Sequence, residues 1–149
     1  MKYLGIVGVS GVGKTVLMHN LIKMYPSVFF KMEQCTTREI RADEVGDAYI
    51  WLNSKRDFFK LEHLLIAKTE VRGNYYGTIP EERDGMIGIV ILNTKGLLDL
   101  LNNPPLNRDE YYIVGLDKRE AEVVREGRDE SYIAREREVL DYADMLITL

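Results

Sequence analysis

The chain has 149 residues, a length that suits one domain with a sizeable core. Hydrophobic residues make up 46% of it and charged residues 30%, which is a globular composition. The net charge of −4 gives no reason to expect binding to nucleic acid or to an anionic membrane, although local basic clusters can still hold phosphates.

Cysteine content and hydropathy narrow the class of protein further. The single cysteine, Cys35, excludes an internal disulfide framework and fits a reduced compartment. No apolar stretch approaches the ~18 residues of a membrane span. The first predicted strand begins close to Met1, so no signal peptide is evident and we expect a cytoplasmic protein. His19 and His63 lie far apart on predicted helices, so we expect no metal site built from histidine and cysteine.

A glycine-rich segment near the N-terminus carries the most informative pattern. An apolar run at 3–7 predicts a buried strand, and apolar positions from Lys14 to Tyr25 predict a helix that Pro26 ends. Between them, residues 8–15 read Gly-Val-Ser-Gly-Val-Gly-Lys-Thr. This is the phosphate-loop pattern G-x-x-x-x-G-K-[ST] in its required strand–loop–helix context. An ordinary glycine-rich turn explains the glycines but not the Lys-Thr pair.

The chemistry of this loop predicts a nucleoside triphosphate site that uses Mg²⁺. Its glycines let backbone N–H groups surround phosphate oxygens, and the helix N-terminus adds positive partial charge. Lys14 is expected to reach the β- and γ-phosphates, and the Thr15 hydroxyl to bind Mg²⁺. The expected nucleotide contacts are Gly8, Ser10, Gly11, Val12, Gly13, Lys14 and Thr15.

The remaining elements follow from hydrophobic periodicity and turn signals. A polar excursion at 33–47 is expected to be exposed, and Ser54 is the expected N-cap of a helix. The continuous apolar run at 87–92 suits a strand covered on both faces, as in a parallel sheet. The other expected elements are strands at 28–30, 49–52, 65–67, 111–116 and 145–149, helices at 54–64, 79–84, 95–101, 118–124 and 131–142, and loops at 73–74 and 102–105.

The alternation of strands and helices predicts a three-layer α/β domain, here the P-loop NTPase fold with a mainly parallel sheet. Polar segments near 33–78 and 125–137 are expected to form appendages to that domain rather than separate domains. A phosphate loop alone serves GTPases, ATPases and kinases equally, so other segments must decide the function.

Three further segments resemble motifs of the guanylate kinase family. Residues 35–49 begin Cys-Thr-Thr-Arg-Glu-Ile-Arg and are similar to the family's S-T-T-R-x-P-R-x-G-E-x-x-G-x-D-Y segment. Residues 73–78, Gly-Asn-Tyr-Tyr-Gly-Thr, look like its G-N-Y-Y-G-[ST], and residues 126–128 resemble its lid. The resemblance implies one domain, with a core formed by 1–32 and 79–149, a monophosphate-binding subdomain at about 33–78 and a lid at about 125–137.

The resemblance implies a kinase that transfers the γ-phosphoryl group of ATP to GMP, dGMP or a related monophosphate. It places Arg38, Arg41, Tyr49 and Tyr76 on the acceptor phosphate. Their chemistry suits this role, because guanidinium groups bind phosphate oxygens and phenols donate hydrogen bonds to them. The alternatives are surface pairing of the arginines with nearby glutamates and half-buried packing of the tyrosines.

Lys14, Arg41 and Arg128 are the catalytic residues that the resemblance implies. Phosphoryl transfer needs positive groups that neutralise charge on the moving γ-phosphoryl group, and Arg128 in the lid is the candidate arginine for this. A closed lid would exclude water, so that ATP is not hydrolysed without an acceptor.

The sequence departs from the family where the family reads the guanine ring. Gln34 stands in place of a serine and Ala67 in place of a glutamate; Gln34 can still hydrogen-bond a base edge, but Ala67 cannot. Glu70 is expected to be exposed surface, and Asn93 aligns with the first aspartate of a D-x-D pattern. Gln34, Thr78 and Asn93 complete the expected acceptor site. The acceptor is therefore expected to be GMP, another monophosphate, or several.

Two other functions stay open from the sequence. Some guanylate kinase-like domains bind protein ligands without transferring phosphate, and the changed D-x-D region favours that class of protein. The intact Lys14-Thr15 pair opposes it. A P-loop NTPase that hydrolyses its nucleotide is the second alternative, but it leaves the Arg/Tyr pattern unexplained.

Overall fold

The computed structural model describes residues 1–9, 11–42, 49–102, 110–117 and 138–148. Most of its helices and strands fall where the hydrophobic pattern predicts them. In chain order they are β1 (Tyr3–Gly8), α1 (Lys14–Met24), β2 (Phe29–Lys31), β3 (Gln34–Thr36), β4 (Ile50–Trp51), α2 (Lys55–Leu61), the 3₁₀ helix η1 (Glu62–Leu64), β5 (Ile66–Val71), β6 (Asn74–Thr78), β7 (Ile87–Ile91), α3 (Thr94–Asn102), β8 (Tyr111–Asp117), the 3₁₀ helix η4 (Glu138–Tyr142) and β9 (Met145–Thr148). The expected loop at 102–105 lies largely outside the described residues, as do the helix at 118–124 and most of the one at 131–142.

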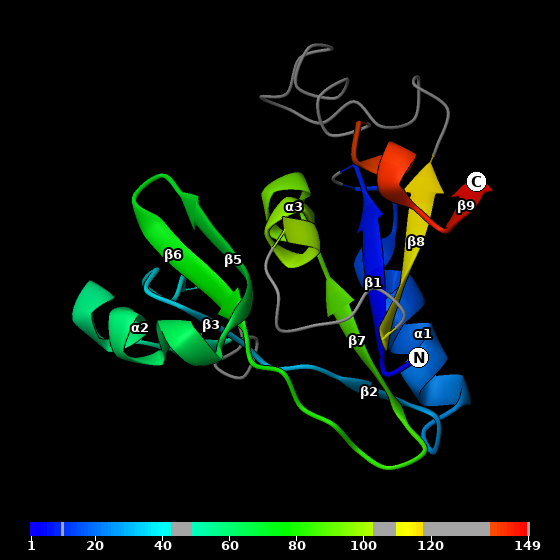
Figure 1. Cartoon of the computed structure of the whole chain (residues 1–149), viewed down its shortest axis with the longest axis horizontal. Helices are drawn as coiled ribbons and strands as arrows, with labels where there is room; N and C mark the ends of the chain where they lie inside the picture. The colour runs from blue at the N-terminus through cyan, green and yellow to red at the C-terminus, as the bar shows by residue number, and fades with distance from the viewer. Residues whose placement is uncertain (10, 43–48, 103–109, 118–137, 149) are drawn as a thin grey trace.

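The strands form two sheets (Figure 1). A five-stranded sheet has the order β2-β7-β1-β8-β9, and a four-stranded sheet has the order β4-β3-β6-β5. Every neighbouring pair in the first sheet is parallel. The carboxyl ends of its strands therefore share one edge, where the phosphate loop follows β1 and Asn93 follows β7. Ligands of open α/β sheets bind at such an edge.

Helices cover both faces of the parallel sheet. Tyr3 and Val7 of β1 pack in one core cluster with residues of α3, whereas Leu4 and Ile6 pack in another with residues of α1. Since side chains alternate between the faces of a strand, an all-apolar strand such as β1 supplies both clusters. The predicted three-layer α/β fold with a mainly parallel sheet is confirmed.

The second sheet has a small core of its own. Cys35, Phe58 and Leu65 are buried together beneath α2. Ser54 caps α2 as predicted, since its hydroxyl accepts a hydrogen bond from the Asp57 backbone N–H at 3.2 Å. Burial raises the pKa of the Cys35 thiol, so this thiol stays protonated at neutral pH and serves packing rather than nucleophilic chemistry.

The expectation of an exposed excursion at 33–47 was wrong for its first residues. Gln34–Thr36 form β3, which lies between β4 and β6, and the side chains of Cys35 and Thr36 are completely buried. The polar Thr36 is tolerated there because its hydroxyl donates to the Tyr75 carbonyl at 2.9 Å. The polar composition of this segment therefore led to a wrong prediction of exposure for a strand that lies inside the sheet.

The expected helix at 79–84 was also wrong. This segment is an extended connection between the two sheets. Its first N–H, from Ile79, donates to the carbonyl of Glu33 at 2.8 Å, and Lys2 pairs with Glu82 at 2.9 Å. A helix of six residues is too short to be stable by itself, so these long-range partners decide the conformation.

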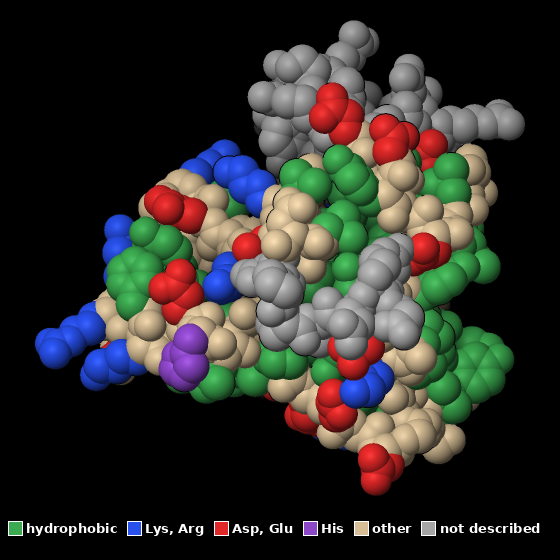
Figure 2. Space-filling model, viewed as in Figure 1, with side chains coloured by type: hydrophobic (Ala, Val, Ile, Leu, Met, Phe, Trp, Pro, Cys, Tyr) green, Lys and Arg blue, Asp and Glu red, His purple; other side chains and the backbone are tan. Residues whose placement is uncertain are grey.

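Basic side chains gather on one part of the surface (Figure 2). In this view most of the Lys and Arg side chains lie over the lobe formed by α2, β5 and β6. That lobe is locally positive in a chain whose net charge is −4. In the part of the chain that the structure describes, no helix combines the length and apolarity needed to cross a membrane.

Two adjacent phenylalanines test the core of the second sheet. Phe58 is 2% exposed and stacks on Tyr75 at 5.2 Å between ring centroids, whereas Phe59 is 50% exposed. We expect Phe58→Ala to lower the free energy of unfolding by about 3–5 kcal/mol. Phe59→Ala, the matched control, should lower it by about 1 kcal/mol or less. Urea unfolding of both variants measures the difference, and equal losses would contradict the assigned core.

Candidate functional site

The phosphate loop has a backbone that only glycine supports. Gly8, Gly11 and Gly13 have φ angles of 152°, 83° and 108°. A Cβ atom on Gly8 would lie 2.5 Å from the carbonyl oxygen of Leu116. The loop therefore passes too close to β8 for any side chain at this position, and left-handed φ values of this kind are costly for other residues.

The loop ends at the exposed N-terminus of α1. Gly13 is the N-cap and has no side chain to bond the first helical N–H groups. Those N–H groups are the donors with which a helix N-terminus binds phosphate. Lys14 Nζ donates to the Gly8 carbonyl at 2.7 Å, so the ammonium group lies across the loop. These groups fit a triphosphate, and the Thr15 hydroxyl beside them is of the kind that binds Mg²⁺.

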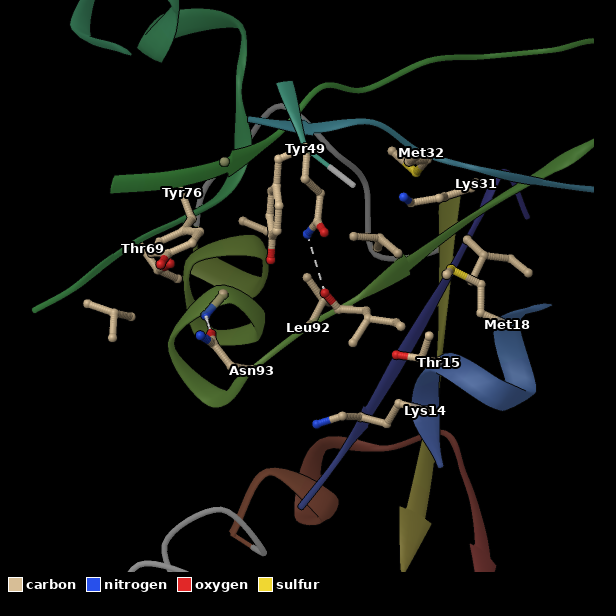
Figure 3. Close-up of a pocket in the computed structure, with 18 of the residues that line it drawn as sticks. Lys14, Thr15, Met18, Lys31, Met32, Tyr49, Thr69, Tyr76, Leu92 and Asn93 are labelled. Atoms are coloured by element: carbon tan, nitrogen blue, oxygen red, sulfur yellow. Dashed lines mark hydrogen bonds between the residues drawn. The ribbon is translucent and has the colours of Figure 1, made fainter. Parts of the chain in front are cut away.

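A cleft of about 730 Å³ separates the phosphate loop from the second sheet. Lys14 and Thr15 line it from α1, and Gln34, Tyr49 and Tyr76 line it from the second sheet and the segment before β4. Figure 3 shows Lys14 and Thr15 on one side of this space and Tyr49 and Tyr76 on the other. Predicted donor and acceptor residues that are far apart in sequence thus face one cleft.

Arginine and aromatic side chains form a cluster at the second sheet. The Arg38 guanidinium carbon lies 5.7 Å from the centre of the Tyr49 ring and 5.3 Å from that of Trp51. Tyr49 also packs against Tyr76, with 6.1 Å between ring centroids. Cation–π contacts of this length orient a guanidinium. Arg38 is thereby held beside Tyr49, which lines the cleft, although its own side chain is not part of the lining.

Backbone bonds hold Arg38 in this place. The Thr37 hydroxyl accepts from the Tyr75 N–H at 2.9 Å, and the Thr36 hydroxyl accepts from the Arg38 N–H at 3.1 Å. The Thr-Thr-Arg segment and the Tyr-Tyr segment are therefore fastened to each other. This explains why the motif needs hydroxyl residues before its arginine.

Gln34 links the second sheet to the parallel sheet. Its Nε2 donates to the Ile91 carbonyl and to the Thr78 hydroxyl, both at 3.4 Å. Thr78 was expected to bind substrate, but it is completely buried behind Gln34. In this structure Thr78 orients Gln34, and Gln34 presents the polar surface to the cleft.

A strained bulge forms the β5 wall of the cleft. Ala67 has φ 51°, a value uncommon for residues other than glycine, and the pairing of β5 with β6 shifts between Ile66 and Thr69. The next N–H, from Lys68, donates to Asp99 Oδ2 of α3 at 2.7 Å. The bulge is thus fastened to α3, which lies between the two sheets in Figure 1.

Glu70 does not replace the family's glutamate in the cleft. It is exposed and is absent from the lining, whereas Ala67 and Thr69 line the cleft. Partial burial raises the pKa of Tyr75, and the Glu70 carboxylate, which hydrogen-bonds the phenol, raises it further. Glu70 therefore lies beside Tyr75 and outside the cleft. The expectation that Glu70 is exposed surface is confirmed.

Asn93 has a structural task as well as a place in the cleft. Its Oδ1 accepts from the Gly96 N–H at 2.7 Å, which makes it the N-cap of α3. It also lines the cleft. The side chain can therefore offer its amide N–H₂ group to a ligand while its oxygen holds the helix.

Some predicted residues lie away from the cleft or outside the described part. Arg41 is exposed and not among the lining residues. Ser10, Arg128 and the expected lid at 125–137 fall outside the described residues. Their roles stay predictions.

Lys31 and Thr69 also line the cleft, although no motif of the sequence points to them. Lys31 ends β2 at the carboxyl edge of the parallel sheet, and Figure 3 shows it on the cleft. Thr69 stands two residues after Ala67 on the same strand. The rule that ligands bind at the carboxyl edge, and the two-residue period of a strand, were the signals available for them.

No three His, Cys, Asp or Glu side chains group as a possible metal site within the described ranges.

A parallel sheet whose first strand leads through a glycine loop to a helix N-terminus defines a P-loop nucleotide-binding protein. The family model for guanylate kinase matches residues 1–95. Guanylate kinases of Trichormus variabilis and Prochlorococcus marinus are 36% identical over 83 residues and 40% identical over 76 residues. The chain belongs to the guanylate kinase family.

The similarity does not extend over whole relatives. The two alignments cover 52% and 49% of this chain and 39% of each relative, so the chain spans about two fifths of the length of the curated proteins it matches. The crystal structure of guanylate kinase from Anaplasma phagocytophilum has the same fold, with a TM-score of 0.73 over 99% of this chain and 76% of that one. At 21% identity that likeness concerns the fold alone.

The geometry of Gly8 yields a test of the loop. Gly8→Ala places a methyl group against the Leu116 carbonyl, so the loop must move and its N–H groups lose their alignment. We expect ATP–Mg²⁺ affinity to fall by about tenfold or more, the effect of losing a charge-assisted hydrogen bond. Calorimetric titration of the folded variant measures it.

Gly73→Ala is the matched control, because Gly73 also has a positive φ of 81° but has nothing within 4 Å of an added Cβ. It should keep the wild-type affinity for ATP. An unchanged affinity in Gly8→Ala would show that the loop does not bind the nucleotide.

Proposed function

We propose that this chain is an ATP-dependent nucleoside monophosphate kinase, which phosphorylates GMP, dGMP or a related monophosphate. The observation that carries the proposal is that Lys14 and Thr15 of the phosphate loop line the same cleft as Gln34, Tyr49 and Tyr76. A site that only hydrolysed a triphosphate has no need of this second polar wall. Family membership through residues 1–95 supports the same activity.

The donor would be ATP with Mg²⁺, held by residues 8–15. Backbone N–H groups of the loop and the α1 N-terminus would bind its phosphates, and the Thr15 hydroxyl would hold the metal ion. Bound Mg²⁺ neutralises negative charge on the β- and γ-phosphates. Lys14 adds a positive charge at the same place, since its ammonium lies across the loop beside Gly8.

The acceptor phosphate would be bound by Arg38, Arg41, Tyr49 and Tyr76. The Arg38 guanidinium contacts the rings of Tyr49 and Trp51, and Tyr49 lines the cleft, which supports a place for Arg38 near the acceptor phosphate. The second pKa of a phosphate monoester is about 6, so the attacking oxygen is already ionised at neutral pH. No general base is therefore required.

The chain would act mainly by positioning two phosphates and neutralising their charge. Lys14 and Arg41 are the proposed catalytic residues of the described part. We also propose Arg128, in a lid at about 125–137, as the arginine that contacts the transferred group. Residues 33–78 would form the monophosphate-binding subdomain, and the protein would work in the cytoplasm.

Acceptor-dependent release of ADP tests the function. We expect ADP release from ATP–Mg²⁺ to rise at least about tenfold when a suitable monophosphate is added, because the enzyme requires an acceptor. A coupled assay with GMP, dGMP, IMP, AMP, dTMP and CMP, each tested separately, measures it. ADP release at one rate with or without every monophosphate would favour a P-loop NTPase. Absence of any release would favour a binding module.

Single substitutions separate the donor and acceptor sides. Lys14→Ala should lower kcat by about a hundredfold or more, as loss of a group that stabilises transition-state charge does. Arg41→Ala should raise KM for the monophosphate by about tenfold or more and leave ATP affinity near wild type.

The controls are Lys23→Ala on the same helix as Lys14 and Arg56→Ala on α2, both exposed. Each should leave the kinetic constants unchanged. Wild-type values of KM and kcat for the monophosphate in Arg41→Ala would remove Arg41 from the acceptor site.

A further inference from the structure

The cleft has an unusual balance of charge. Lys14, Lys31 and His19 line it, but none of the described residues in its lining is an aspartate or glutamate. A cleft of this kind favours an anionic ligand such as a phosphate. Its described lining offers no carboxylate to a hydrogen-bond donor of the ligand.

The orientation of the Gln34 amide is fixed by chemistry. The Ile91 carbonyl can only accept a hydrogen bond, so the amide group 3.4 Å from it must be the nitrogen of Gln34. The same nitrogen donates to Thr78 Oγ1. Both of its hydrogens have partners, and the group that Gln34 offers to the cleft is therefore its carbonyl oxygen, one neutral acceptor.

The opposite wall is neutral and held in place. Ala67, Thr69 and Val71 of β5 line the cleft. The bulge that sets their direction is fastened by the 2.7 Å bond from the Lys68 N–H to Asp99 Oδ2. The next carboxylate along the strand, Glu70, is exposed, pairs in register with Tyr75 and does not line the cleft. This wall cannot bring an acidic group into the cleft without a change of sequence.

The hydrogen-bonding groups on these two walls determine which purine bases the cleft can recognise. Guanine presents two adjacent donors, the ring N1–H and the 2-amino group, and a carboxylate with its two oxygens suits that pair. One amide oxygen satisfies one of the donors. Hypoxanthine has the same carbonyl and ring N–H but lacks the 2-amino group. Its single donor on this edge therefore needs only one acceptor.

We propose that the acceptor base is read through its ring N–H by the Gln34 carbonyl oxygen, and that the 2-amino group is not recognised. The site then takes 6-oxopurine monophosphates as a class, IMP as well as GMP. This inference rests on the proposed kinase function for its biological meaning, but its binding consequence is independent of turnover.

Equilibrium binding of GMP and IMP to the wild-type chain is the primary test. Calorimetric titration in the presence of a non-hydrolysable ATP analogue and Mg²⁺ should give dissociation constants within about threefold of each other, because the described lining brings no carboxylate to the 2-amino group. GMP binding more than about tenfold tighter than IMP overturns the proposal, as does binding of neither nucleotide.

Two variants test which residues recognise the base. Gln34→Leu should weaken both nucleotides by about tenfold and keep their ratio, since both lose the same acceptor. Ala67→Glu should raise the preference for GMP over IMP by about tenfold, because it adds a carboxylate for the 2-amino group. His63→Glu, an exposed control on the same lobe, should leave the ratio at its wild-type value.

The variants can also contradict the proposal. A Gln34→Leu protein that loses affinity for GMP alone shows that Gln34 reads the 2-amino group. A folded Ala67→Glu protein with the wild-type ratio shows that the β5 wall does not face that group. ADP release measured in parallel separates the two ideas: equal binding of GMP and IMP without turnover supports this base reading and defeats the proposed kinase function.

Discussion

The hydrogen bond from the Lys68 N–H to the Asp99 carboxylate, 2.7 Å long, joins the second sheet to the helix that packs on the parallel sheet. It fastens the bulge of β5 to α3, a helix whose N-cap, Asn93, lies two residues after the end of β7 in the parallel sheet. The Gln34 amide adds a second connection, to Ile91 of β7. Because these bonds join the second sheet to the carboxyl edge of the parallel sheet, two elements far apart in sequence become the walls of one cleft.

Local signals in the sequence were sufficient for the parts of the site that local interactions build. The loop at 8–15 needs positive φ at its glycines and a helix immediately after them, and both requirements are visible in the residues themselves. The helix at 54–64 was equally predictable, since Ser54 caps it. Such elements carry their own stabilising contacts, and the structure has them within a few residues of the predicted bounds.

Long-range contacts decided what the sequence could not predict. The segment 79–84 contains residues that tolerate a helix, yet the carbonyl of Glu33 and the side chain of Lys2 hold it extended. The polar side chain of Thr36 predicts a surface position, but Thr36 is buried because β3 lies between β4 and β6. Thr78 supports Gln34, and Thr69 lines the cleft. The sequence alone could not predict either position, because both follow from the pairing of β6 with β3 and with β5.

The capping bond of Asn93 also affects how the site can hold a cation. Its oxygen is engaged by the Gly96 N–H, so the carboxyl end of β7 presents a neutral amide to the cleft. In the described lining the protein itself therefore supplies no negative charge to balance a divalent ion. Under the proposed function, the charge of a bound magnesium ion would therefore be balanced by the nucleotide phosphates rather than by the described lining.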